Sequence, residues 1–137
     1  GTHSERLVTI GEIAASYGIS RNHLVKVVHH LGGAGFVYTT RGKGGGVRLM
    51  ARPEEINLGQ VIRTTEGGFD LVECMNSSTN TCPITQMCLL QGVVCEALSA
   101  FTAVWDSYTL ADILQNRAQL AQVLVPLARV RRVIRVE

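Results

Sequence analysis

The feature that most constrains the fold is a pair of short helical patterns separated by only three residues, Gly18-Ile-Ser20. The first pattern begins with Thr9-Ile-Gly-Glu12, the spacing of a capping box, and the second runs from about Arg21 to Leu31. The glycine of the turn suits the left-handed end of a helix, and its serine is a good N-cap for the next one. We expect Ile19 to point inward. Two short helices joined so tightly predict a helix-turn-helix.

The second helical pattern separates an apolar face from a polar one. Its apolar positions follow the i, i+3, i+4, i+7 spacing of a buried stripe: Leu24, Val27, Val28 and Leu31. Its start carries the polar side chains Ser20, Arg21, Asn22, His23 and Lys26. In a major groove Arg pairs with guanine and Asn with adenine, so these five residues are the predicted recognition surface. We expect His29 and His30 to lie at the surface rather than to act as ligands.

A glycine-rich basic hairpin follows the second helix. Two short β-patterns, residues 36–40 and 47–50, flank the segment Arg41-Gly-Lys-Gly-Gly-Gly46. Taken alone the glycines are also compatible with any flexible turn, and no Lys-Ser/Thr follows them to make a nucleotide-phosphate loop. After a recognition helix, however, a hairpin with Arg41 and Lys43 at its tip predicts a wing that contacts DNA. The expected fold is mainly α with a small β-wing: a winged helix-turn-helix plus a long dimerisation helix.

The charge is divided along the chain. Residues 1–63 hold eight Lys or Arg and four acids, residues 64–112 hold six acids and no Lys or Arg, and the last 25 residues hold five Arg and one Glu. The basic first block suits a polyanion such as double-stranded DNA, while the acidic middle block does not. No apolar run is long enough to span a membrane and no secretory signal is present, so we expect a cytoplasmic protein.

All four cysteines lie in the acidic block, and three of them fall within fifteen residues. Seven residues separate Cys74 from Cys82, and five separate Cys82 from Cys88. Thiolates at such wide spacing favour an iron–sulfur cluster, of two-iron or four-iron type, over zinc, which usually draws on Cys-x-x-Cys pairs. Reduced thiols acting as a switch, a structural zinc ion, and a Cys82–Cys88 disulfide stay open as alternatives. Cys95 lies two helical turns beyond Cys88, and we expect it to be a small buried hydrophobic residue.

A long helix is predicted from about Gln86. Its apolar side is made by Leu90, Val94, Ala97, Leu98, Phe101, Val104 and Trp105. Because a small winged helix cannot cover so much apolar surface, this helix predicts a homodimer that presents two recognition helices to two half-sites. We expect Thr109 to cap a last short helix at 110–114. The arginine-rich tail, Val123 to Val136, is assigned no role.

The functional parts are therefore expected as residues 1–67 for DNA binding, 68–89 for the cysteine loop, 86–115 for dimerisation, and 116–137 for the tail. An enzyme with a cysteine nucleophile is disfavoured. His23, His29 and His30 belong to the basic head, the cysteines belong to a distant loop, and no triad-like order joins them.

With these residues in place, the chain resembles the family of dimeric iron–sulfur winged-helix repressors that includes the nitric-oxide sensor NsrR and the cluster-biogenesis regulator IscR. The resemblance rests on residues 20–26, 35–37 and 41–49, on the three cysteines, and on Tyr108-Thr-Leu-Ala-Asp112. Residues 20–26 and 108–112 look like the NsrR branch. The resemblance implies a cluster on Cys74, Cys82 and Cys88, attack by nitric oxide, loss of DNA affinity, and release of repressed genes. Gly1 falls after the place of the family's N-terminal helix, so no fourth ligand is named.

Overall fold

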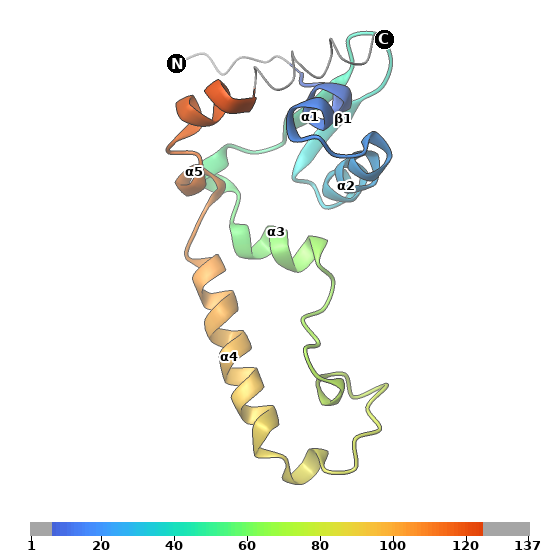
Figure 1. Cartoon of the computed structure of the whole chain (residues 1–137), viewed down its shortest axis with the longest axis vertical. Coiled ribbons are helices and arrows are strands. Elements are labelled where there is room, and N and C mark those ends of the chain that lie inside the picture. Colours follow the sequence, from blue (N-terminus) through green and yellow to red (C-terminus); the bar gives the residue numbers. More distant parts are fainter. Residues whose placement is uncertain (1–6, 125–137) are drawn as a thin grey trace. The chain divides into compact units, whose positions relative to one another are not determined.

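The computed structural model describes residues 7–124, and their contacts divide the chain into two compact units. The first unit comprises residues 7–56 and 110–124, and the second comprises residues 57–109 (Figure 1). The two units are described separately below. The predicted mainly α fold with one small antiparallel hairpin is confirmed.

The first unit contains the helix-turn-helix and the hairpin. Its elements are α1 (Ile10–Tyr17), α2 (Arg21–Gly33), β1 (Val37–Thr40), β2 (Gly46–Leu49), the 3-10 turn η1 (Pro53–Glu55) and α5 (Leu110–Ile113). Residues 117–124 are also helical. The amide of Leu110 donates to the carbonyl of Ile56 at 2.8 Å, which places α5 against the end of η1.

The predicted start and end signals of α1 are confirmed. Glu12 N donates to Thr9 Oγ1 at 3.1 Å, and Thr9 N donates to Glu12 Oε2 at 2.9 Å, which completes the capping box. Gly18 ends the helix with φ 67°, a left-handed conformation that glycine adopts without strain. Ser20 then accepts a bond from His23 N at 3.4 Å and so begins α2. The prediction for Ile19 is wrong: its side chain is 41% exposed and does not belong to the core cluster.

The core of the first unit is small and lies between the two helices and the hairpin. Ala14, Leu24 and Val28 are buried, and Ile10, Ile13, Val37 and Val47 pack against them. Leu24 and Val28 are only 7% and 5% exposed, as expected for the apolar stripe of α2. Burying that stripe turns the opposite face of α2, including His29 and His30, toward solvent.

The hairpin gains a third short partner. β1 and β2 pair with Val37 opposite Leu49 and Thr40 opposite Gly46. On the other edge of β2, Val8 and Val47 exchange two backbone hydrogen bonds of 3.1 and 2.8 Å. A Cβ at Gly46 would lie 2.8 Å from the Val8 carbonyl oxygen, so glycine is required where this chain approaches.

The second unit consists of two helices and the loop between them. Its elements are α3 (Leu58–Thr65), the 3-10 turns η2 (Glu73–Met75) and η3 (Thr85–Met87), and α4 (Leu89–Asp106). The long helix starts at Leu89 rather than at the expected Gln86, because η3 takes up residues 85–87 and Cys88 becomes the N-cap. Gln91, Val94, Leu98, Thr102 and Trp105 are the half-buried residues of α4. Phe101 stacks edge-on against both Phe69 and Trp105 at 6.1 Å between ring centroids.

Candidate nucleic-acid interface and cysteine loop

The start of α2 presents the predicted recognition residues to solvent. Ser20, Arg21, Asn22, His23 and Lys26 are all exposed. The first turn of α2 contains no acidic residue, so the positive end of the helix dipole is not neutralised by its own carboxylates. Donors and a cation at a free helix start can bond to base edges or to phosphates.

The tip of the hairpin carries the other predicted DNA contacts. Arg41 and Lys43 are exposed, and Gly42 and Gly44 take φ values of 92° and 80°. A Cβ at Gly45 would collide with the Thr40 carbonyl oxygen, so the tip must be glycine-rich to turn as tightly as it does. These glycines leave the backbone open to close approach by a partner.

The outer face of the hairpin holds a cation–aromatic pair. Tyr38 and Arg48 are opposite each other in the register, and the Arg48 guanidinium carbon lies 5.0 Å from the centre of the Tyr38 ring. Pairs of this kind on an exposed sheet face contribute modestly to stability. This contact engages the Arg48 guanidinium with the Tyr38 ring.

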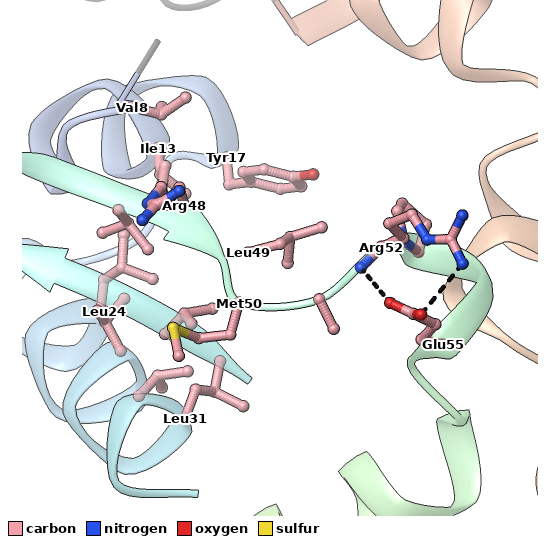
Figure 2. Close-up of a pocket in the computed structure, with 16 residues that line it drawn as sticks. Val8, Ile13, Tyr17, Leu24, Leu31, Arg48, Leu49, Met50, Arg52 and Glu55 are labelled. Carbon is pink, nitrogen blue, oxygen red and sulfur yellow. Dashed lines mark hydrogen bonds and ion pairs between the residues drawn. The ribbon is translucent and has the colours of Figure 1, made fainter. Parts of the chain in front are cut away.

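An apolar groove of about 870 Å³ lies in the first unit (Figure 2). Tyr17, Leu49 and Met50 line it and are each at least 41% exposed. The charged side chains Arg52 and Glu55 at its edge pair with each other at 3.1 Å, and bonds from Arg52 hold the pKa of Glu55 below its usual value. With its carboxylate committed, the groove offers apolar surface rather than acid–base chemistry.

The three predicted ligands Cys74, Cys82 and Cys88 lie in the second unit as half-buried free thiols. Cys74 is in η2, Cys82 is in the following loop, and Cys88 directly precedes α4. Across the described part of the chain, no three His, Cys, Asp or Glu side chains come together closely enough to hold a metal ion. The donor set fits an iron–sulfur cluster by its chemistry, but the thiols are not gathered around one point.

Hydrogen bonds to the Glu73 side chain brace the cysteine loop next to Cys74 and Cys82. Glu73 Oε1 accepts from Thr81 N at 2.6 Å and from Thr81 Oγ1 at 2.5 Å, which joins the residues that precede Cys74 and Cys82. These bonds hold the pKa of Glu73 below its ordinary value of 4.5. The loop therefore closes through a carboxylate and a threonine.

Three further hydrogen bonds brace the loop. Asn80 Oδ1 accepts from Cys82 N at 3.0 Å, and its amide nitrogen donates to Thr85 Oγ1 at 2.9 Å. Gln91 of α4 donates to the Cys74 carbonyl oxygen at 3.2 Å. The sequence predicted this stretch only as the cysteine loop at residues 68–89, without its internal hydrogen bonds. The one available signal was the position of Glu73 and Thr81, each directly before a cysteine.

Cys95 corrects its prediction. It is exposed on α4 rather than buried, although it lies next to the half-buried face of that helix. No residue of α4 is fully buried. Helical spacing therefore identifies the apolar positions of this helix but does not show which of them are covered by other parts of the chain.

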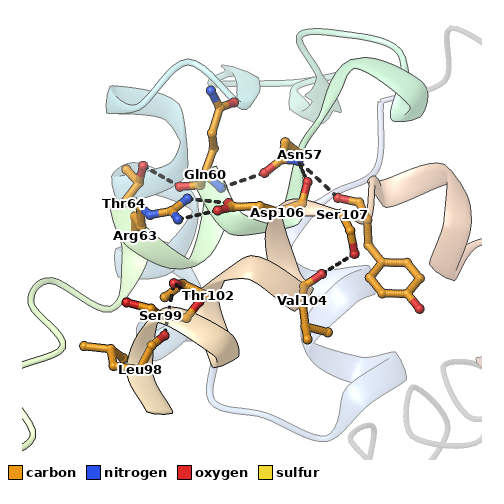
Figure 3. Close-up of polar contacts among 11 residues, drawn as sticks. Asn57, Gln60, Arg63, Thr64, Leu98, Ser99, Thr102, Val104, Asp106 and Ser107 are labelled. Carbon is orange, nitrogen blue, oxygen red and sulfur yellow. Dashed lines mark hydrogen bonds and ion pairs between the residues drawn. The ribbon is translucent and has the colours of Figure 1, made fainter. Parts of the chain in front are cut away.

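The ends of α3 and α4 are joined by polar contacts that the sequence did not reveal (Figure 3). Arg63 donates two bonds of 2.6 Å to the two carboxylate oxygens of Asp106. These bonds hold the pKa of Asp106 below its ordinary 3.8. Asn57 accepts from Gln60 N to cap α3 and donates to the Asp106 carbonyl oxygen at 2.8 Å. A two-bonded pair of this kind fixes the orientation of the two helix ends.

The outward side of α4 is apolar and uncovered. Leu89 and Leu90 are 89% and 63% exposed, and Val93, Phe101 and Val104 are each about half exposed or more. Within the described residues, no helix is both long and apolar enough to cross a membrane. An apolar surface on one long helix is typical of a protein–protein interface.

Comparisons with known proteins agree on one family. A profile of Rrf2, described as an iron-dependent transcriptional regulator, matches residues 1–116. The HTH-type transcriptional regulator NsrR of Bacillus licheniformis is 49% identical over 122 residues, which cover 89% of this chain and 85% of the relative. NsrR of Bacillus subtilis is 48% identical over 118 residues, covering 86% of this chain and 81% of the relative.

Solved structures agree with this comparison. IscR of T. potens matches with a TM-score of 0.62 and 27% identity, over 82% of this chain and 72% of that one. CymR, the global cysteine regulator of B. subtilis, matches with a TM-score of 0.61 and 30% identity, over 81% and 80% of the two chains. The relatives are named as transcriptional regulators and not as enzymes.

Proposed function

The chain belongs to the Rrf2 family of transcriptional regulators, and from that premise we propose that it is a repressor that senses nitric oxide through an iron–sulfur cluster. The identity of nearly half the residues with regulators named NsrR carries this proposal. Cys74, Cys82 and Cys88 would hold the cluster, of two-iron or four-iron type. We infer a cytoplasmic location, because the proposed partner is DNA and the thiols must stay reduced.

DNA binding is assigned to two surfaces of the first unit. On α2, Ser20, Arg21, Asn22, His23 and Lys26 form the recognition surface, and on the hairpin Arg41 and Lys43 form the wing contact. All seven are exposed, and the start of α2 lacks acidic residues. A helix start of this character suits a major groove, while tip cations suit the neighbouring phosphates or a minor groove.

The protein acts as a homodimer in this proposal. The uncovered apolar side of α4 supports it, because Leu90, Val93 and Val104 recur at the spacing of one helix face. Two copies joined there would offer two recognition helices to a two-fold operator.

The cluster would couple the cysteine loop to DNA affinity. When bound, it supplies a centre that reacts with nitric oxide. The three cysteines would tie η2, the following loop and the start of α4 together, and so fix the spacing of the two recognition helices in the dimer. Release of the cysteines would free the loop and lower operator affinity. A signal changes affinity only if the two states bind DNA unequally, so holo and apo protein must differ.

The testing experiment is an anaerobic absorbance spectrum with iron and sulfide analysis, followed by titration with nitric oxide. We expect visible charge-transfer bands that bleach with nitric oxide, in parallel with loss of operator binding. Serine substitutions at Cys74, Cys82 or Cys88 should abolish the bands. Cys95→Ser is the matched control and should keep them, because Cys95 is exposed on a distant turn of α4.

A second candidate is a regulator of the same fold without a cluster, which responds through its thiols or holds structural zinc. The observation that favours it is the absence of a gathered ligand set among the described residues. A colourless protein after attempted cluster assembly would support it and contradict the cluster proposal. One equivalent of zinc would then identify a zinc site, and operator binding that changes with thiol oxidation would identify a switch.

A further inference from the structure

An open hollow of about 380 Å³ lies in the first unit between the start of α1, the exposed side of α2 and the wing. Arg21 of α2 and Arg41 of the wing both line it, together with His29 and the hydroxyl-bearing Thr9 and Thr40. No Asp or Glu is among its lining residues. Its polar groups are therefore cationic or neutral, a composition that suits an anion.

No acidic residue in the described part of the chain neutralises the two arginines. Among the described residues, neither Arg21 nor Arg41 makes an ion pair, whereas Arg52 and Arg63 each have a carboxylate partner. Arg21 is the first residue of α2, where the helix dipole is positive and no acidic side chain compensates it. Two arginines and a helix start line one hollow, and an anion bound there would offset the repulsion among these positive charges.

The wall on the wing side allows close approach by a large anion. Gly42, Gly45 and Gly46 line it, and none of them presents a side chain. A Cβ at Gly45 or Gly46 would collide with neighbouring backbone atoms, so the wall cannot easily acquire side chains by substitution. Two planar guanidinium groups match the oxygens of a phosphate, which each can bind with two parallel bonds.

We propose that this hollow binds one backbone phosphate of DNA, clamped between Arg21 of α2 and Arg41 of the wing. The inference rests on the proposed DNA binding and refines it. Arg21 then belongs to the contacts that position the protein on any duplex, and Asn22 beside it belongs to the contacts that distinguish bases. This assignment changes the sequence-based expectation that Arg21 pairs with guanine.

The test compares Arg21→Gln with Asn22→Ala on two DNA probes. One is a duplex that the wild-type chain selects from a random library, and the other is an unselected random duplex. We expect Arg21→Gln to weaken binding to both by the same factor, on the order of tenfold, because a charged hydrogen-bonded contact is lost. The slope of log affinity against log salt should become shallower by about 0.9. Asn22→Ala should weaken only the selected duplex.

A methylphosphonate scan of the selected duplex provides the second readout. Replacing phosphates one at a time should reveal a position where wild type loses affinity and Arg21→Gln loses none further, because the contact is already absent. Arg21→Lys should keep the salt slope while losing affinity, since it retains the charge but not the fork.

Three outcomes would overturn the clamp. These are a relaxed base preference for Arg21→Gln, an unchanged salt slope, and additive losses at every methylphosphonate position. In each of those cases the wild type still binds its selected duplex, so DNA binding by the regulator stands. A wild-type chain that selects no duplex and binds neither probe would instead overturn the proposed function together with the clamp.

Discussion

Asn22 is exposed at the second position of α2, one residue past the start of the helix. Its side-chain amide both donates and accepts, as bidentate pairing with adenine requires. We predict that Asn22→Ala costs about 1–3 kcal/mol of binding free energy on operator DNA and leaves random DNA unaffected. Fluorescence anisotropy with both duplexes at one salt concentration measures the two affinities. Equal losses on both duplexes would contradict a role in base recognition.

The Arg63–Asp106 pair predicts how stability depends on pH. The pKa of Asp106 is lowered in the folded state, so its contribution is present above the ordinary value of 3.8 and is lost as pH falls through the folded pKa. We predict that Asp106→Asn is less stable than wild type at pH 7 and that the difference shrinks below about pH 3.8.

Urea unfolding of wild type and Asp106→Asn between pH 7 and pH 2 measures this difference. Glu96→Gln, a change on the exposed side of the same helix, is the control and should follow wild type throughout. A difference that stays constant down to pH 2 would show that charge on Asp106 does not matter.

Roles that depend on residues nearby in the sequence were predicted well. Contacts between residues far apart in the sequence were not predicted. Thr9, Gly18 and Ser20 act within three or four positions of their partners, so spacing alone was enough to assign their roles. Arg63 and Asp106 are 43 positions apart, and nothing in their neighbourhoods indicates a pair. Cys95 was wrongly expected to be buried, since periodicity identifies a helix face without showing what covers it.

At the scale of elements, the capping box stabilises the start of α1, the first helix of the helix-turn-helix. Removing the Thr9 hydroxyl leaves the Glu12 amide without its partner at the helix start. We predict that Thr9→Ala lowers the free energy of unfolding by about 1 kcal/mol. Chemical denaturation followed by circular dichroism measures it. Thr79→Ala, in an exposed loop, should change stability little, and an equal loss there would remove the special role of the cap.

Two glycines, one at the contact between α3 and α4 and one away from it, are predicted to respond in opposite ways to substitution by alanine. A Cβ at Gly59 would collide with the Asp106 carboxylate, whereas a Cβ at Gly92 of α4 meets nothing within 4 Å. We predict that Gly59→Ala destabilises the protein by about 1–3 kcal/mol through overpacking. Gly92→Ala should be neutral or stabilising by up to about 1 kcal/mol, because alanine favours a helix. Thermal unfolding compares them, and similar melting temperatures would contradict tight packing at Gly59.

The elements themselves were largely predictable, because each has a strong local pattern. The hairpin and α2 lie within a residue or two of their expected bounds. The start of α4 was misplaced because η3 and its cap at Cys88 depend on the folded loop. The bonds of Glu73 and Asn80 were not predicted, since polar loops do not reveal which side chains meet. The seven DNA contacts and the three cluster ligands stay predictions.

At the scale of the whole molecule, the chain leaves the first compact unit after Ile56 and returns to it at Leu110. The second unit thus contains all four cysteines and all of α4, while the seven predicted DNA-contact residues lie in the first. The expected four-part division by function stays a proposal, because compactness alone does not assign roles. In the proposed dimer, α4 would join two copies that each carry one recognition helix.

The dimer prediction follows from the uncovered side of α4. We predict that Val93→Glu yields a monomer, because a carboxylate on an interface helix loses its water when two copies meet. Operator affinity should then fall far more than affinity for random DNA, since only a dimer engages two half-sites at once. Analytical ultracentrifugation over a range of concentrations measures the mass, and anisotropy measures both affinities. Glu96→Lys, a charge reversal on the same helix, should stay dimeric.

The two readouts in this experiment separate two different failures. A monomeric wild type would show that the apolar side of α4 serves another partner, and the operator would then be recognised one half-site at a time. A Val93→Glu variant that stays dimeric would move the interface elsewhere on the chain. If the variant is monomeric but binds the operator as tightly as wild type, the link between dimer geometry and recognition fails. In that case the cysteine loop could not control DNA binding by fixing the spacing of two recognition helices.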